Sequence, residues 1–447
     1  VLNRTYDQDY QLIAQQVGTW QSQYSHDANG NITAHAHSLF GSINYRYDAL
    51  DRLTMEEAGL RKTYTYDANG NRTSRTTAHT SLGITYFQHR LRYAPDSNRL
   101  LQSDSLYEAE VDAAGNYTRH TLSKRYQYDD QGRLSNVIDQ RGNGVARYTY
   151  NALGQRVLKE ARQGTNRLPF TYLYGPNGQV LGQVSYTAQG RKSKASYYVW
   201  LDDLPIAQID LAYNFAGTVV DSTTLTYLHS DHLNTPRLAT NQSGNLVWSW
   251  QSDAFGIGQP KTQGSNIDVI LRFPGQIADT HSELFYNYFR DYDPQTGRYV
   301  ESDPIGITRN YKFTPEFLAG GVIGVTSNSK TEINHLYGYS NGNPINLFDP
   351  LGLDVCSCLA PQTGVRDDAG NKICTYNCVC TKDSGEKYAK SIQACEGDGG
   401  SATCKGQWED AWNPDPRART GFEPFNIDTE GIWDKIFNSK YIEGLVR

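Results

Sequence analysis

The chain has 447 residues and a net charge of −6, and it contains 32 tyrosines and 40 glycines but a single methionine, Met55. This composition favours many short strands joined by tight turns over a helical bundle, because tyrosine suits strands and glycine suits turns. The acidic balance disfavours a protein that binds nucleic acid or anionic membranes. No apolar stretch approaches the ~20 residues needed to cross a bilayer, so we expect no membrane-spanning segment.

One short pattern recurs through the first half, often at a spacing of ~20 residues, which is typical of a repeat architecture. Two tyrosines at alternate positions point to one face of a strand, and a following Asp or Asn begins a turn in which glycine takes the left-handed conformation. Each copy is therefore predicted to be a β-hairpin that buries its face only when it stacks on its neighbours. The copies lie at residues 24–32, 45–53, 64–72, 126–134 and 148–156.

These copies resemble YD repeats, the units of Rhs proteins, of the C components of insecticidal toxin complexes and of teneurin shells. The resemblance implies a mainly β fold, in which an array of hairpins curls into a hollow shell around a cargo. An ordinary β-sandwich with tyrosine-rich strands is the alternative, but the motif repeats too literally for it. Residues 1–7 read like the middle of a repeat and not like a signal peptide, so we expect an upstream portion that carries any export signal.

From about residue 227 the sequence resembles the Rhs-associated core. The matching segments lie at 227–238, 247–256, 271–276, 286–294, 297–306, 336–346 and 349–353. We therefore predict a YD-repeat shell over 1–226, an Rhs-associated core over 227–353, and a variable C-terminal cargo, a toxin, over 354–447. Residues 308–334 are extra relative to the family, and this insertion either forms a surface loop or moves the predicted cleavage site out of register.

The resemblance also implies an aspartic-type autoprotease that cuts after a DPxGL motif, which here is DPLGL. The matching catalytic positions are Arg290, Asp291 and Asp303, and the scissile bond is Leu353–Asp354. Two carboxyl groups held close together share a proton, so that one can activate water while the other protonates the leaving group. A purely turn-forming role for the Asp-Pro pairs is the alternative. The cleavage motif itself is defined by Asp349, Pro350 and Gly352.

A second cluster of polar residues, at 229–232, reads His-Ser-Asp-His and invites a metal or catalytic interpretation. Neighbouring residues on a strand point to opposite faces, and no further ligand follows at a suggestive spacing. We therefore interpret this segment as a turn with strand pairing.

All ten histidines precede residue 336, whereas all seven cysteines lie in the last 94 residues. The cargo is thus predicted to be a small Cys-rich α+β segment, with a short amphipathic helix at 432–437. Its lack of histidine argues against His-dependent nucleases and His-ligated zinc deaminases. Disulfides, a structural zinc site and a catalytic thiolate remain open for the cysteines. They are Cys356, Cys358, Cys374, Cys378, Cys380, Cys395 and Cys404.

The sequence therefore predicts a secreted Rhs-type effector whose shell encapsulates a toxin and releases it by self-cleavage for delivery into target cells. The implied partners are its own cargo, an immunity protein, and either a type VI-like secretion component or a toxin-complex B subunit. No cofactor is expected. The competing hypothesis is a structural or adhesive YD-repeat surface protein without proteolysis. Nothing in residues 354–447 identifies the toxin's activity or target.

Overall fold

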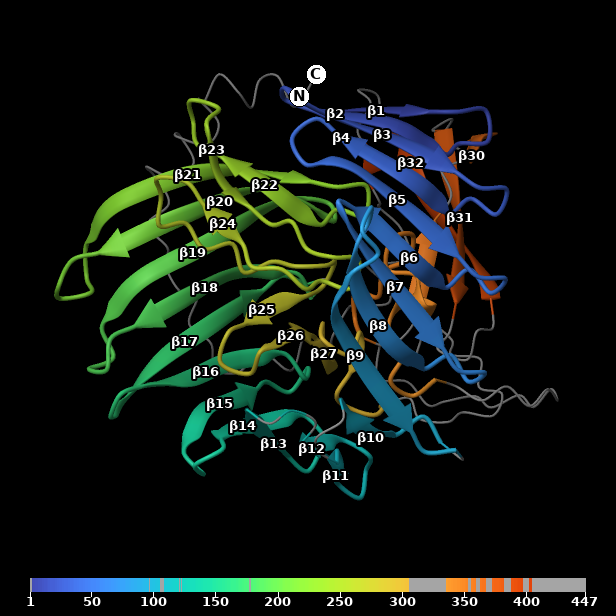
Figure 1. Cartoon of the computed structure of the whole chain (residues 1–447). Coiled ribbons are helices and arrows are strands. Elements are labelled where there is room, and N and C mark those ends of the chain that lie inside the picture. Colours follow the sequence, from blue (N-terminus) through green and yellow to red (C-terminus); the bar gives the residue numbers. More distant parts are fainter. Residues whose placement is uncertain are drawn as a thin grey trace.

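The computed structural model describes residues 2–304, except positions 96, 105–107, 120, 122 and 177, together with residues 335–352 and five strands within 355–403. Antiparallel strands dominate these residues (Figure 1), and the prediction of a mainly β fold is confirmed. A short 3-10 helix, η2 (Ser340–Gly342), lies in the second described stretch. Among the described residues, no helix is long and apolar enough to cross a membrane.

A ten-stranded sheet comes first, and in it each strand pairs with the next strand along the chain. Such a meander needs only short turns, which the Asp-x-x-Gly segments provide. Its strands are β1 (Leu2–Tyr6), β2 (Leu12–Val17), β3 (Trp20–His26), β4 (Ile32–His37), β5 (Gly41–Tyr47), β6 (Leu53–Ala58), β7 (Leu60–Tyr66), β8 (Arg72–His79), β9 (Thr85–Tyr93) and β10 (Leu100–Ser103).

A small hairpin, β11 (Glu110–Val111) and β12 (Tyr117–Arg119), leads to a second meander of twelve strands. The predicted boundary between residues 226 and 227 falls inside β21, so this sheet carries both repeat and core sequence. Its strands are β13 (Lys124–Tyr128), β14 (Leu134–Asp139), β15 (Gly144–Tyr150), β16 (Arg156–Gln163), β17 (Asn166–Tyr174), β18 (Val180–Tyr186), β19 (Lys192–Leu201), β20 (Leu204–Tyr213), β21 (Val220–Ser230), β22 (Pro236–Thr240), β23 (Leu246–Ser249) and β24 (Lys261–Thr262).

The repeat hairpins use the predicted turn. In the third copy, one carboxylate oxygen of Asp67 accepts hydrogen bonds from the backbone nitrogens of Asn69 and Asn71, both at 2.9 Å, and Gly70 has φ +86°. The same two-bond pattern recurs at Asp27, Asp48, Asp129 and Asn151. The second copy lacks the glycine, and Asp51 takes its left-handed conformation with φ +60°.

The second tyrosine of each Tyr-x-Tyr pair ties one hairpin to the previous one. In the fifth copy the hydroxyl of Tyr150 donates to the carbonyl of Leu134 at 2.7 Å, where the strand of the preceding copy begins. Equivalent bonds run from Tyr47 to Ile32, from Tyr66 to Leu53, from Tyr93 to Arg72, from Tyr128 to Tyr117 and from Tyr174 to Arg156. Each buried hydroxyl is satisfied by its neighbour, so the ladder works only as a stack.

A third, four-stranded sheet lies between the two large sheets (Figure 1). Its strands are β25 (Ile277–Asp279), β26 (Leu284–Asn287), β27 (Arg290–Asp293) and β28 (Arg298–Tyr299). We call residues 250–304 and 335–352 the inner segment. Three hydrophobic clusters join it to the shell: Phe285 packs in one with Tyr172, Leu284 in another with Tyr126, and Phe255 in a third with Tyr64. The core of the protein is therefore the junction of shell and inner segment.

The predicted cargo contains a five-stranded sheet of its own. The register sets Cys356 opposite Cys380 and Cys358 opposite Cys378, while the predicted helix at 432–437 and Cys404 lie outside the described residues. The choice between disulfides, zinc and a thiolate stays a prediction. The strands are β29 (Val355–Cys358), β30 (Gln362–Arg366), β31 (Lys372–Thr381), β32 (Lys387–Glu396) and β33 (Ala402–Thr403).

Candidate functional site

The predicted cleavage motif forms a tight buried turn at the end of the inner segment. Asp349 is fully buried, and one of its carboxylate oxygens accepts from the backbone nitrogens of Leu351 at 3.3 Å and Gly352 at 2.8 Å. Gly352 has φ +72°, a conformation that glycine adopts without strain. The Asp and Gly of the motif are thus both explained by the local geometry of this turn.

Residues of the inner sheet and of the turn beside it bind the backbone carbonyls of the motif. The side-chain amide of Asn287 donates to the carbonyl of Asp349 at 2.8 Å, and the nitrogen of Phe289 donates to the carbonyl of Leu351 at 3.2 Å. A β-carbon built on Gly352 would lie 2.6 Å from the carbonyl oxygen of Asn287, and one built on Gly275 would collide with the carbonyl of Pro350. The motif therefore passes so close to the sheet that only glycine fits at these two points.

Arg290 connects the motif to a carboxylate from another part of the chain. Its guanidinium lies 3.2 Å from Asp303 and 3.5 Å from Asp349, and its Nε donates to the carbonyl of Gly352. The same guanidinium lies over the ring of Tyr299, 3.7 Å from the centroid, and the hydroxyl of Tyr299 donates to Asp349 at 2.8 Å. The structure thus brings Arg290 and Asp303, two of the predicted site residues, together at the predicted cleavage motif.

Asp291, the third predicted site residue, has a different set of partners. Nη2 of Arg156 lies 2.8 Å from both of its carboxylate oxygens, and its backbone nitrogen donates to Glu301 at 2.6 Å. Burial raises the pKa of the Asp291 carboxyl, although the charge of Arg156 opposes that shift. Because successive strand residues point to opposite faces, Asp291 and Arg290 serve two different clusters. Proton sharing between Asp291 and Asp303 stays a prediction.

The Arg156 cluster extends to a second carboxylate. Asp279 lies 3.4 Å from Lys159 and 3.8 Å from Arg156, and it accepts from the hydroxyl of Tyr148 at 2.7 Å. Burial disfavours its charge, but Lys159 and its other partners hold the pKa of Asp279 well below its usual range. The guanidinium of Arg156 also lies 4.1 Å from the ring centroid of Tyr286.

Sequence reasoning missed these partners of Asp291. Arg156 lies 135 positions from Asp291, in the fifth repeat copy, where it reads as an ordinary strand residue. Glu301 lies within the recognised 297–306 segment, and its place between Val300 and Ser302 gave no sign of a role. The residues of the predicted scissile bond, Leu353 and Asp354, and the insertion 308–334 lie outside the described residues.

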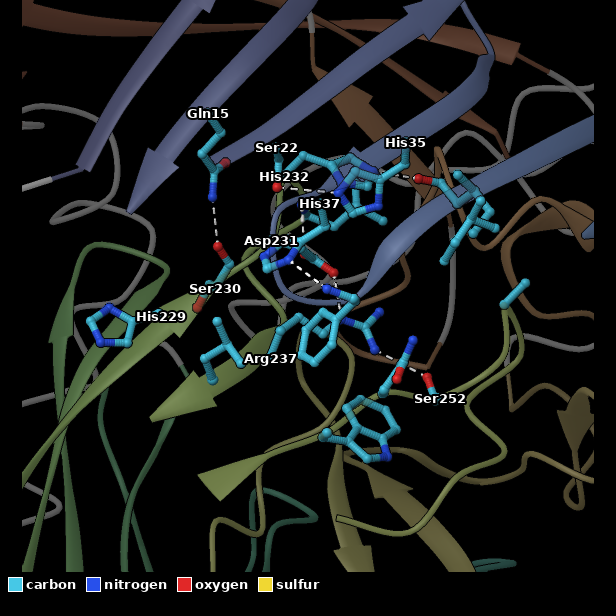
Figure 2. A pocket seen from close by; sticks show the side chains of 18 of the residues that line it. Gln15, Ser22, His35, His37, His229, Ser230, Asp231, His232, Arg237 and Ser252 are labelled. Atoms are coloured by element: carbon cyan, nitrogen blue, oxygen red, sulfur yellow. Dashed lines mark hydrogen bonds and ion pairs between the residues drawn. The ribbon is translucent and has the colours of Figure 1, made fainter. Parts of the chain in front are cut away.

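A separate cavity of about 90 Å³ lies where the first sheet meets the end of the second (Figure 2). Four histidines, His35, His37, His229 and His232, are among the residues that line it. Gln15 on β2 crosses this seam and donates to the carbonyl of Ser230 at 2.7 Å. Burial lowers the pKa of His35 to about 3 and that of His229 to about 4, so both imidazoles are neutral near pH 7.

The His-Ser-Asp-His segment serves this seam. Asp231 accepts from the backbone nitrogens of Leu233 and Thr235 and pairs with Arg237 at 2.8 Å, which makes it a turn former. His232 lies 2.7 Å from the carbonyl of Ile345. Within the described part of the chain, no group of three or more His, Cys, Asp or Glu residues is arranged to hold a metal ion. These contacts agree with the predicted turn and strand pairing.

Stacked hairpins with one turn chemistry, wrapped around an inner segment, define a repeat-built β-shell protein. The family model described as the teneurin YD-shell matches residues 39–345. The chain therefore belongs to the YD-shell family, and the predicted relationship to Rhs/YD-repeat toxins is confirmed by its relatives.

Two of these relatives are toxins. The chain is 29% identical over 378 residues to double-stranded DNA deaminase toxin A of Burkholderia cenocepacia. The alignment covers 79% of this chain and 24% of the relative. It is 24% identical over 382 residues to toxin protein Tse5 of Pseudomonas aeruginosa, with 75% and 27% covered. The chain thus spans about a quarter of the length of the curated relatives it matches.

Solved structures show the same fold. The crystal structure of TcdB2-TccC3 superposes with a TM-score of 0.61 at 18% identity, over 79% of this chain and 18% of that chain. The Tc holotoxin pore of Photorhabdus luminescens gives the same TM-score and identity, over 78% of this chain and 18% of that chain.

Proposed function

We propose that this chain is part of a secreted Rhs-type effector whose β shell encloses a C-terminal toxin and frees it by self-cleavage after Leu353. The proposed parts are the repeat shell over 1–226, the Rhs-associated core over 227–353 and the toxin over 354–447. Membership of the YD-shell family and similarity to two named toxins support this proposal.

The observation that carries the self-cleavage proposal is the contact between Arg290 and the cleavage motif. Its guanidinium contacts the carbonyl of Gly352, the residue directly before Leu353, and pairs with Asp303 at the same time. A motif that only ended the fold would not need a buried arginine on the carbonyl of Gly352, next to the proposed scissile residue. A protease needs such a contact, because catalysis depends on the geometry of the peptide bond beside the catalytic groups.

The proposed reaction is hydrolysis of the Leu353–Asp354 peptide bond. A water oxygen bonds to the carbonyl carbon of Leu353 while a carboxylate takes a proton from that water. The carbon–nitrogen bond then breaks, and a protonated carboxyl gives its proton to the leaving nitrogen of Asp354. Asp303, paired with Arg290, is the candidate base, and Asp291, whose pKa is raised by burial, is the candidate acid. Since the substrate belongs to the same chain, one turnover suffices and no substrate affinity is needed.

The proposed partners follow from the relatives. Similarity to TcdB2-TccC3 favours a toxin-complex B component, whereas similarity to the two bacterial toxins favours a secretion-machine component. In either case an immunity protein would protect the producing cell from the toxin. Toxicity of residues 354–447 expressed alone, relieved by a neighbouring small gene, would support this assignment.

The decisive test is the intact mass of the purified full chain beside Asp291→Asn and Asp303→Asn variants. We expect the wild type to yield one fragment that ends at Leu353 and one that begins at Asp354, and both variants to stay whole. Asp48→Asn, which alters a repeat turn, serves as the control and should still be cut. An uncut wild-type chain with a harmless tail would instead favour a structural or adhesive surface protein.

A further inference from the structure

We propose that Glu301 holds a proton at rest and passes it to Asp291, which then delivers that proton to the leaving nitrogen during cleavage. This inference rests on the proposed self-cleavage and adds a residue to it. Glu301 is a positioning residue in this scheme, because it acts through Asp291.

Contact between the two residues is close and fully buried. The backbone nitrogen of Asp291 donates to Oε2 of Glu301 at 2.6 Å, and the two side chains are 2% exposed each. The backbone nitrogen of Val300 donates in turn to the carbonyl of Asp291 at 3.0 Å, so that the chain beside Glu301 is tied to the strand of Asp291. The Glu301 side chain is thus held against the backbone of Asp291, and it also forms a side-chain hydrogen bond with the Asp291 carboxyl.

Hydrogen bonding indicates that Glu301 is the protonated partner. Its other oxygen, Oε1, is buried and has no hydrogen-bond partner within the described part of the chain, and no ion pair there includes Glu301. An ionised carboxylate in that position would leave a buried charge poorly satisfied, which is unfavourable. A neutral carboxyl avoids that cost and has a hydrogen to share.

Charge balance in the cluster leads to the same assignment. The cluster holds two cations, Arg156 and Lys159, and three carboxyls, Asp279, Asp291 and Glu301, all of them buried. With one carboxyl protonated the cluster is neutral. Asp279 contacts both cations and Asp291 contacts Arg156, which leaves Glu301 as the carboxyl without a cation of its own.

Near pH 7 the groups that face the pair from the surrounding strands are two cations, one carboxylate and several neutral tyrosines. They are Arg156 and Lys159 on β16, Asp279 on β25, Tyr148 and Tyr150 on β15, Tyr128 on β13 and Tyr286 on β26. Burial raises the pKa of Glu301 well above its usual range, and the charge of Asp291 raises it further. Burial also raises the pKa of each of these tyrosines, so none supplies a competing negative charge.

The test is self-cleavage of the full chain made by cell-free synthesis, followed by intact mass over time in buffers from neutral to alkaline pH. We expect the Glu301→Gln variant to be cut at least about tenfold more slowly and to lose the alkaline fall in rate that the wild type shows. Glu301→Asp should recover part of the rate. Glu56→Gln is the matched control, because Glu56 is also a buried carboxyl but pairs with Lys62, away from the motif.

The outcomes separate this inference from the proposed function. If Asp291→Asn blocks cleavage while Glu301→Gln is cut at the wild-type rate with the wild-type pH profile, the proposed function stands and the inference is wrong. If the wild type is never cut, the proposed function fails, and infrared spectroscopy decides about the proton on Glu301. The neutral wild type should then show a buried protonated-carboxyl band that Glu301→Gln lacks, and absence of that band would refute the inference.

Discussion

The repeat sheets and the inner segment use the same residue types in opposite ways. In the sheets, Asp48 pairs with Arg52 four positions away, at the half-exposed end of a hairpin. In the inner segment, Asp291 pairs with Arg156 across 135 positions, and both side chains are almost fully buried. A local pair such as Asp48 with Arg52 forms within a single hairpin. The pair of Asp291 with Arg156 forms only when the shell and the inner segment pack together. Breaking the distant pair is therefore expected to cost more stability than breaking a local pair.

The largest expected difference follows from breaking one pair of each kind. Arg156→Met should lower the free energy of unfolding by about 3–5 kcal/mol, because it leaves a buried carboxylate without its cation. Arg52→Met should cost about 1 kcal/mol or less, since its pair is partly screened by solvent. Guanidinium chloride unfolding measures both, and equal losses in the two variants would contradict the comparison.

Gly352 and Gly18 have similar backbone conformations, and together they sharpen the comparison between the inner segment and the repeat sheets. Gly352→Ala should lower stability by about 2–4 kcal/mol and stop cleavage, since its new β-carbon would meet the carbonyl of Asn287. Gly18→Ala in the repeat sheet carries only the left-handed strain, about 1 kcal/mol, because nothing lies within 4 Å of its β-carbon position. Thermal unfolding measures the loss of stability, and intact mass measures the loss of cleavage. A Gly352→Ala variant that stays uncut but is as stable as the wild type would show that this glycine serves cleavage and not stability.

The seam between the sheets should respond to acid. The folded-state pKa of His229 is about 4, below the unfolded value of 6.5, so the unfolded chain binds its proton first. Stability is then complete above pH 6.5 and falls toward pH 4, by up to about 1.4 kcal/mol per pH unit for this group. The stability difference between wild type and His229→Gln should be constant above pH 6.5 and shrink below it. A difference that stays constant down to pH 4 would contradict this assignment.

The smallest expected effect concerns two tyrosines of the ladder. Tyr128→Phe removes a hydroxyl that donates to one carbonyl, and we expect a loss of about 1 kcal/mol. Tyr150→Phe should cost roughly twice as much, because the hydroxyl of Tyr150 also accepts from the guanidinium of Arg156 at 3.0 Å. Urea unfolding of both variants compares a contact within the shell with one that also reaches Arg156. A larger stability loss for Tyr128→Phe than for Tyr150→Phe would contradict this difference between the two tyrosines.

The fold was predictable because its unit is short. The tyrosine pair, the turn-forming Asp and the glycine lie within nine residues, and their contacts in the third copy, from Asp67 to Asn71, span only four positions. Part of the candidate site was predictable for another reason. Arg290 and Asp303 matched a family pattern, and the structure brings them together at the motif. Asp291 matched the same pattern, but its partners Arg156 and Glu301 carried no signal in the sequence.

The sequence by itself determined the hairpin and its turn, since both depend on residue type within a short span. The hydroxyl ties between successive copies appeared only in the structure, and the place of the cleavage motif stays a prediction. Only the tertiary structure decided which cation faces Asp291, that Glu301 lies beside it, and that His229 and His35 meet at a seam. The contact of Arg156 with Asp291 and the histidine seam join different sheets, and Glu301 lies just after β28 of the inner sheet. Their partners depend on how far the shell curls and which face of each strand turns inward, and a repeating pattern does not encode either.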